Sequence, residues 1–202
     1  MQDIKIDGVG KLYGGGEYRK VVIDGVAECE ENLRAQRLEI DGKFQCSGNI
    51  DVEELHCDGI AKFLGYVHAK RIELDGYVAV ENGGDFAARE ILCDGGLKSD
   101  GQISADHLFV DGFLDAKEIV GEKIEIHSTP RAVARLFTRQ GCKAELIEAT
   151  ELYLEGVKAE EVNGQHITVG RGCVIERLDC NGTLHIEGNA VIHQITGSYT
   201  NV

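Results

Sequence analysis

The sequence predicts an all-β chain that forms a single-stranded β-helix, or β-solenoid, with about 17 residues in each three-sided coil and one short helical insertion. Three observations predict it. Asp-Gly pairs recur at nearly constant spacing, short stretches alternate apolar and polar residues, and the 202 residues include 26 Gly but a single Pro. Many glycines without proline indicate repeated tight corners rather than a flexible linker.

The Asp-Gly pairs define the repeat, because their sequence numbers increase in nearly equal steps: 7, 24, 41, 58, 75, 94 and 111. We expect the aspartates to form a structural column at one corner of the coil. Each carboxylate would accept backbone N–H bonds, and the next glycine would take a left-handed conformation. Asn163 and Asn181, each followed by Gly, are assigned to the same column, which favours this role over cation binding. The column comprises Asp7, Asp24, Asp41, Asp58, Asp75, Asp94 and Asp111.

Each repeat contains three short apolar alternations, which predict three strands with one buried face. In one repeat they are Leu38/Ile40, Phe44/Cys46 and Ile50/Val52. Strands of one repeat, separated by polar corners, cannot pair with each other. Each is therefore expected to pair in parallel with the same strand of the neighbouring repeat, about 4.8 Å away.

The repeats divide the chain into N-terminal coils (1–127), an insertion (128–143), C-terminal coils of the same solenoid (144–197) and a tail (198–202). Pro130 and Gly141 suit the first turn and the end of a helix of about three turns in the insertion. This helix is a candidate contact for a membrane surface or a partner, and the alternative is that it packs on the solenoid. Its contact residues are Arg131, Val133, Arg135, Leu136, Phe137 and Arg139.

Composition excludes some partners and suggests a compartment. The 35 acidic residues outnumber the 21 Lys and Arg, giving a net charge of −14, which disfavours nucleic acid as a partner. No segment approaches the about 20 apolar residues of a membrane span, and Met1–Gly10 does not resemble a secretion signal. Seven cysteines, an odd number, indicate reduced thiols. We expect a cytoplasmic protein, peripheral at the inner membrane face if the insertion binds lipid.

No arrangement of residues predicts catalysis, a cofactor or a metal. The cysteines lack Cys-x-x-Cys spacing and alternate with core residues, as small apolar fillers do. His56 is expected at an exposed position between Glu39 and Glu73 in an outward charge ladder. Gly8-Val9-Gly10-Lys11 is followed by Leu12 rather than Ser or Thr, so it does not form a phosphate loop.

The two ends of the solenoid are the candidate functional surfaces. A β-helix ends in unpaired N–H and C=O groups over an apolar layer, and neither end of the sequence offers an obvious cover. We therefore expect association of the chain with itself, end to end. The residues assigned to these terminal coils are Ile4, Ile6, Leu12, Tyr18, Leu184, Ile186, Val191, Ile192 and Ile195.

Particular segments resemble the bactofilins, and more specifically the short polymer-forming cytoskeletal proteins of Firmicutes. They are Ile6–Gly10, the recurring Ile-Asp-Gly corners, Gly14–Tyr18, and the block from Lys143–Ala149 through Ile167–Cys173. The resemblance covers nearly the whole chain. It implies a right-handed β-helix that polymerises without nucleotide into nonpolar filaments and acts as a scaffold for cell-shape, cell-wall or membrane-associated machinery.

The first functional hypothesis is therefore a non-enzymatic, self-assembling cytoskeletal scaffold, whose partners are itself and a membrane surface or cell-envelope proteins. Two alternatives remain. One is an acyltransferase-like enzyme on a left-handed β-helix, although the six-residue period of that fold, with coils of about 18 residues, conflicts with the 17-residue spacing of this chain, and no catalytic histidine is identifiable. The other is a membrane or signalling adaptor that acts through 128–143 without polymerising.

Overall fold

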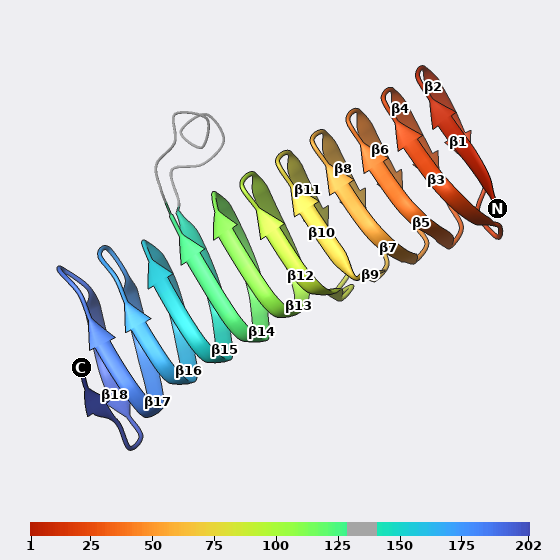
Figure 1. Cartoon of the computed structure of the whole chain (residues 1–202). Coiled ribbons are helices and arrows are strands. Elements are labelled where there is room, and N and C mark those ends of the chain that lie inside the picture. Colours follow the sequence, from red (N-terminus) through yellow and green to blue (C-terminus); the bar gives the residue numbers. More distant parts are fainter. Residues whose placement is uncertain (129–140) are drawn as a thin grey trace.

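The computed structural model describes residues 1–128 and 141–202, which form a β-solenoid of about 11 turns with roughly 17 residues per turn. This confirms the predicted fold class. The turns lie side by side along one axis, with the two ends of the chain at opposite ends of the solenoid (Figure 1). Only strands, turns and bends occur in the described ranges.

The strands are short near both ends of the chain and longest between Gly96 and Ile186. The first eleven are β1 (Gln2–Ile6), β2 (Val9–Leu12), β3 (Glu17–Ile23), β4 (Val26–Cys29), β5 (Leu33–Ile40), β6 (Lys43–Cys46), β7 (Ile50–Cys57), β8 (Ile60–Phe63), β9 (Val67–His68), β10 (Arg71–Leu74) and β11 (Tyr77–Val80). The others are β12 (Phe86–Cys93), β13 (Gly96–Asp111), β14 (Phe113–His127), β15 (Cys142–Glu155), β16 (Val157–Val169), β17 (Val174–Ile186), β18 (Val191–Thr196) and β19 (Thr200–Asn201).

Every strand pairs in parallel with the equivalent strand of the next turn. Leu38 lies between Val21 and Leu55, its equivalents one repeat earlier and one repeat later, as the periodicity predicts. The repeat is longer between β10 and β12, where it accommodates the corner at Asn82 and Gly83. It is shorter between β15 and β16, so the coil tolerates shorter turns as long as the inward columns stay aligned.

The interior is filled by aligned columns of apolar side chains. Phe44, Phe63 and Phe86 are fully buried, and Phe44 meets Phe63 edge to face with ring centroids 6.3 Å apart. Large residues stand beside small ones within a turn: Phe44 accompanies Cys46, and Ala61 accompanies Phe63. All seven cysteines are free and buried, which confirms their expected place in the core.

The Asp-Gly corners stack as predicted, but for different physical reasons. At the corners from Asp24 to Asp94 the backbone N–H groups donate to the preceding turn: those of Asp41 and Gly42 both donate to Ile23 O, at 2.9 and 2.8 Å. The prediction that the carboxylates bond these N–H groups is therefore wrong. The prediction of left-handed glycines is also wrong, because none of the column glycines has a positive φ.

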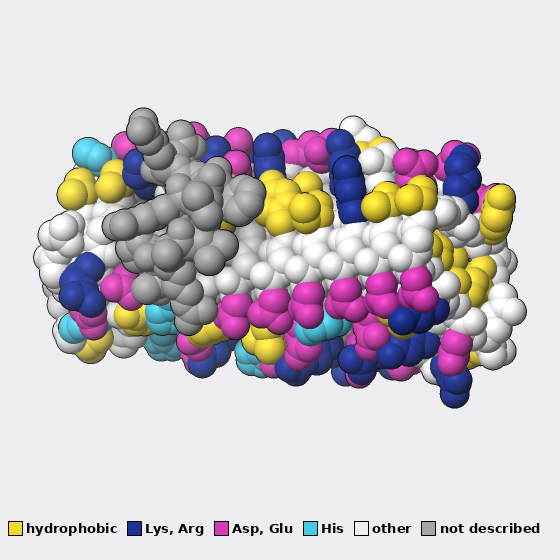
Figure 2. Space-filling view, turned by 90° about the horizontal axis from the view of Figure 1, so that it is seen from above, with side chains coloured by type: hydrophobic (Ala, Val, Ile, Leu, Met, Phe, Trp, Pro, Cys, Tyr) yellow, Lys and Arg dark blue, Asp and Glu magenta, His cyan; other side chains and the backbone are white. Residues whose placement is uncertain are grey.

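These glycines are required by the close approach of successive turns. A Cβ added to Gly42 would lie 1.9 Å from Gly25 O, and one on Gly59 would lie 2.0 Å from Gly42 O. The result is a strip of bare backbone along the solenoid, between a row of acidic side chains and a group of hydrophobic ones (Figure 2).

Asn163 and Asn181 do not belong to the aspartate column, contrary to the prediction. The turn after Asp111 places His127 beside it. Asn163 instead pairs with Glu148 and Asp179 on another face. The shortened turns of this region shift the register, so counting by a fixed period from the N-terminal corners assigns the wrong column.

The boundaries of the predicted segments also change. Strand β15 begins at Cys142, so Cys142 and Lys143 belong to the coils rather than to the predicted insertion 128–143. Most of the predicted helix falls on 129–140, outside the described residues. The predicted tail contributes strand β19, whose Thr200 and Asn201 pair with Thr183 and Leu184.

Candidate functional site

The N-terminal end is closed by an aromatic side chain. Leu12 and Tyr18 are buried, whereas Ile4 and Ile6 are partly exposed against the core. The Tyr18 hydroxyl donates a hydrogen bond to Tyr13 O at 2.6 Å. A buried phenol with a satisfied hydroxyl can cover an apolar end without leaving a polar group unpaired.

Small neighbours explain how a tyrosine fits at this position. Tyr18 pairs with Ala35 and shares its inward column with Val52 and Ala69, all smaller than tyrosine. A Cβ on Gly16 would lie 3.5 Å from the Tyr18 ring, an ordinary van der Waals distance, so the ring packs against this corner. The Tyr18 ring thus covers the apolar interior at this end of the described solenoid.

The C-terminal end is more open. Leu184 is buried, Ile192 and Ile195 are partly buried against the core, and Ile186 is 43% exposed. Val191 is 47% exposed, but it aligns with Val174 on the outward side of the coil rather than with the end layer. The predicted terminal residues therefore gather into an apolar patch of Ile186, Ile192 and Ile195, with Val191 at its rim.

Both ends also carry open sheet edges. Among the described residues, β1 pairs with β3 alone, β2 with β4 alone, and β18 with β17 alone. Strand β19 covers Thr183 and Leu184 but stops before Ile186. Strand edges with unpaired N–H and C=O groups next to apolar side chains can accept a further strand.

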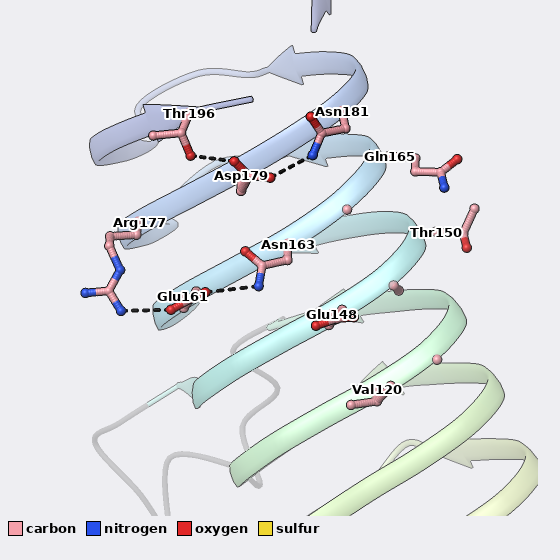
Figure 3. Close-up of a pocket in the computed structure, with 13 residues that line it drawn as sticks. Val120, Glu148, Thr150, Glu161, Asn163, Gln165, Arg177, Asp179, Asn181 and Thr196 are labelled. Carbon is pink, nitrogen blue, oxygen red and sulfur yellow. Dashed lines mark hydrogen bonds and ion pairs between the residues drawn. The ribbon is translucent and has the colours of Figure 1, made fainter. Parts of the chain in front are cut away.

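A hollow with a volume of about 720 Å³ lies on the side wall, over the C-terminal turns (Figure 3). Its floor contains Gly121, Ala149 and Gly164, which lie next to one another in one column. Small residues in this column leave the hollow between larger polar side chains on successive turns.

The polar side chains around this hollow bond mainly to one another. Thr196 donates to Asp179 at 2.6 Å, and Asn181 donates to the same carboxylate at 2.7 Å. Glu161 accepts from Asn163 at 3.0 Å and from Arg177 at 2.8 Å. The Arg177 guanidinium, together with Asn163, lowers the pKa of Glu161. The bonds from Arg177 and Thr196 join adjacent turns, whereas each asparagine bonds a carboxylate of its own strand. We therefore assign the cluster to the stability of the solenoid.

A second hollow, of about 400 Å³, lies on another face and includes His127, Tyr153, His166 and His185. The His127 and Tyr153 rings stack with centroids 4.8 Å apart. His166 Nδ1 lies 2.9 Å from Thr183 Oγ1, and His185 contacts Val202 O. These side chains also connect successive turns.

The predicted contact residues for a membrane or partner, Arg131 to Arg139, lie outside the described residues. In the described part of the chain, no helix has the length and apolar character needed to cross a membrane.

Comparison with known proteins gives no relative: no family model, curated protein or solved structure matches the chain.

Proposed function

We propose that the chain is a bactofilin-like, non-enzymatic scaffold that assembles end to end through its terminal coils. The observation that carries the proposal is the C-terminal end, where the apolar patch of Ile186, Ile192 and Ile195 adjoins the open edge of β18. Burying an apolar layer and pairing a free strand edge both favour association.

The N-terminal end supports the same proposal. Its edges β1 and β2 are open, and Ile4 and Ile6 remain partly exposed beside the Tyr18 side chain. An end joined to another end continues the sheets, so a contact of this kind adds backbone hydrogen bonds as well as apolar burial. Repetition of such contacts produces a filament, and a contact that involves one end alone produces a dimer.

The experiment compares an end variant with a side-wall variant of the same chemistry. Ile186→Asp places a charge in the end patch, and Ile60→Asp places one on the side wall, where Ile60 is 53% exposed. Negative-stain electron microscopy and sedimentation across concentration would report assembly, and circular dichroism would report folding. We expect the unmodified chain and Ile60→Asp to assemble, and Ile186→Asp to remain folded but unassembled.

The proposal fails if the unmodified chain stays monomeric at all concentrations, or if Ile186→Asp assembles as well as Ile60→Asp. A trimer whose size does not change with concentration would favour the enzyme alternative instead. Attachment to a membrane is tested separately, by flotation of the chain with anionic liposomes. Replacing Arg131, Arg135 and Arg139 with Glu should then abolish flotation.

A further inference from the structure

Four polar side chains form a compact group on two adjacent turns of the solenoid. His56 and Glu73 are neighbours on one outward column. Asp58 lies two residues after His56, and Asp75 lies two residues after Glu73, both at the aspartate corner. His56 Nε2 lies 3.1 Å from Asp58 Oδ1. One ligand atom each of His56, Asp58 and Asp75 can be chosen so that all three lie within 4.8 Å of one another.

In the first two turns of the solenoid, the equivalent pair of aspartates holds a positively charged side chain. Lys5 occupies the position equivalent to His56, two residues before Asp7. Its ammonium nitrogen lies 3.1 Å from Asp7 and 2.7 Å from Asp24 on the next turn. A cation therefore bridges two stacked aspartates there, and these two carboxylates in turn raise the pKa of Lys5.

At Asp58 and Asp75 the bridging ammonium is replaced by an imidazole. Unlike an ammonium group, an imidazole has a ring nitrogen whose lone pair can bind a metal ion. We propose that His56 Nε2, Asp58 and Asp75 bind a divalent transition-metal ion, with Zn²⁺ as the best match, which joins the two turns as Lys5 joins the first two. Imidazole together with carboxylates suits Zn²⁺ better than Mg²⁺ or Ca²⁺.

The distances fit a metal of this size. Zn²⁺ holds nitrogen and oxygen ligands at about 2.0–2.2 Å, so neighbouring ligand atoms lie about 3–3.5 Å apart. The 3.1 Å between His56 Nε2 and Asp58 Oδ1 already meets this condition. Asp75 is exposed, so its carboxylate can close the remaining gap by rotating about its side-chain bonds. Water would complete the coordination.

The other ring nitrogen of His56 has the environment expected of a metal-bound histidine. Nδ1 is buried and makes no hydrogen bond, although Glu73 Oε2 lies 3.3 Å from it. Metal at Nε2 fixes the proton on Nδ1, which can then donate to Glu73. Arg71 holds Glu73 in place through an ion pair of 2.7 Å, so this carboxylate is positioned to accept from Nδ1–H.

The site is confined to this pair of turns. At the other corners, the residue two positions before the aspartate is Lys5, Val22, Glu39, Glu73, Leu92 or Phe109. None of these supplies an imidazole. His185 occupies the same outward column near the C-terminal end and lies 3.4 Å from Glu187, but the preceding turn places Thr168 and Gly170 beside them.

The test is calorimetric titration of the full chain with Zn²⁺, together with visible absorption of the Co²⁺ form. We expect one site with nitrogen and oxygen ligands. His56→Gln and Asp75→Asn should abolish it, and Glu73→Gln, which removes only the acceptor of Nδ1–H, should weaken it about 10- to 100-fold. His185→Gln is the matched control and should bind as the unmodified chain does.

His56→Lys separates a bound metal from a merely structural group. It reproduces the Lys5 arrangement, so it should keep the chain folded by circular dichroism and lose Zn²⁺ binding and the Zn²⁺-dependent rise in melting temperature. The proposal is overturned if the chain does not bind Zn²⁺, if His56→Gln binds as tightly as His185→Gln, or if the Co²⁺ form shows a thiolate charge-transfer band, which would place the metal at a cysteine.

Discussion

Gly42 lies so close to Gly25 on the preceding turn that a Cβ on Gly42 would be 1.9 Å from the Gly25 carbonyl oxygen. The obstacle is backbone, which cannot rotate away as a long side chain can. The same contact recurs from Gly25 to Gly112, at 1.9–2.2 Å. The corner of the solenoid is therefore specified by the absence of a side chain, and the repeat period of the sequence reflects this steric requirement.

Replacing Gly42 with Ala should consequently destabilise the protein by about 3 kcal/mol or more, because two turns must move apart. Gly8→Ala is the matched control: Gly8 belongs to the same column, but no atom lies within 4 Å of its Cβ position. We expect its effect to stay within about 0.5 kcal/mol. Urea unfolding measures the free energy of unfolding of both variants. Equal losses of stability would show that backbone conformation, rather than the close approach of the turns, requires glycine at these corners.

The sequence alone predicts the regular part of this fold well. Residues such as Leu38 and Ile40 pair with equivalent residues of the preceding and following turns. The repeat period and the apolar alternation of the sequence therefore determine where they lie. Prediction by counting fails where the environment is not periodic. Asn163 is misplaced because the turns before it are shorter than those near the N-terminus.

The candidate sites are less predictable than the core for the same reason. The sequence predicts Tyr18 in a terminal coil, but not the hydrogen bond from its hydroxyl to Tyr13 O that accompanies its burial. It likewise predicts His56 in an exposed ladder of charged side chains. The relation of His56 to the aspartates of two turns is not visible in the sequence, because it depends on side-chain directions across those turns.

The closure of the N-terminal end yields a second prediction. Tyr18→Phe keeps the ring but removes the hydrogen bond to Tyr13 O, which should cost about 1 kcal/mol of unfolding free energy. Tyr13→Phe is the control, since its hydroxyl lies on an exposed side chain and its carbonyl is unchanged. Thermal melting of both variants provides the measurement. If they melt alike, the hydrogen bond does not hold the Tyr18 ring over the end.

Alkaline pH should destabilise the protein through its buried thiols. Burial raises the pKa of both Cys57 and Cys93 to about 12, from 9.0. Between these values the unfolded chain loses the two protons while the folded chain keeps them, so the free energy of unfolding falls as pH rises. The loss approaches about 1.4 kcal/mol per cysteine for each pH unit above the unfolded pKa.

The contribution of these thiols is isolated by a double variant, Cys57→Val with Cys93→Val. Valine suits this inward column, which contains Val110 and Val169. Lysine and tyrosine side chains titrate in both proteins, so their contributions cancel when the stability of the double variant is subtracted from that of the unmodified chain. Urea unfolding from about pH 8 to about pH 10.5 should show the unmodified chain losing stability faster than the double variant. Parallel curves would contradict the prediction. They would mean that the thiols ionise as readily in the folded chain as in the unfolded one, whereas burial should hinder ionisation in the folded chain.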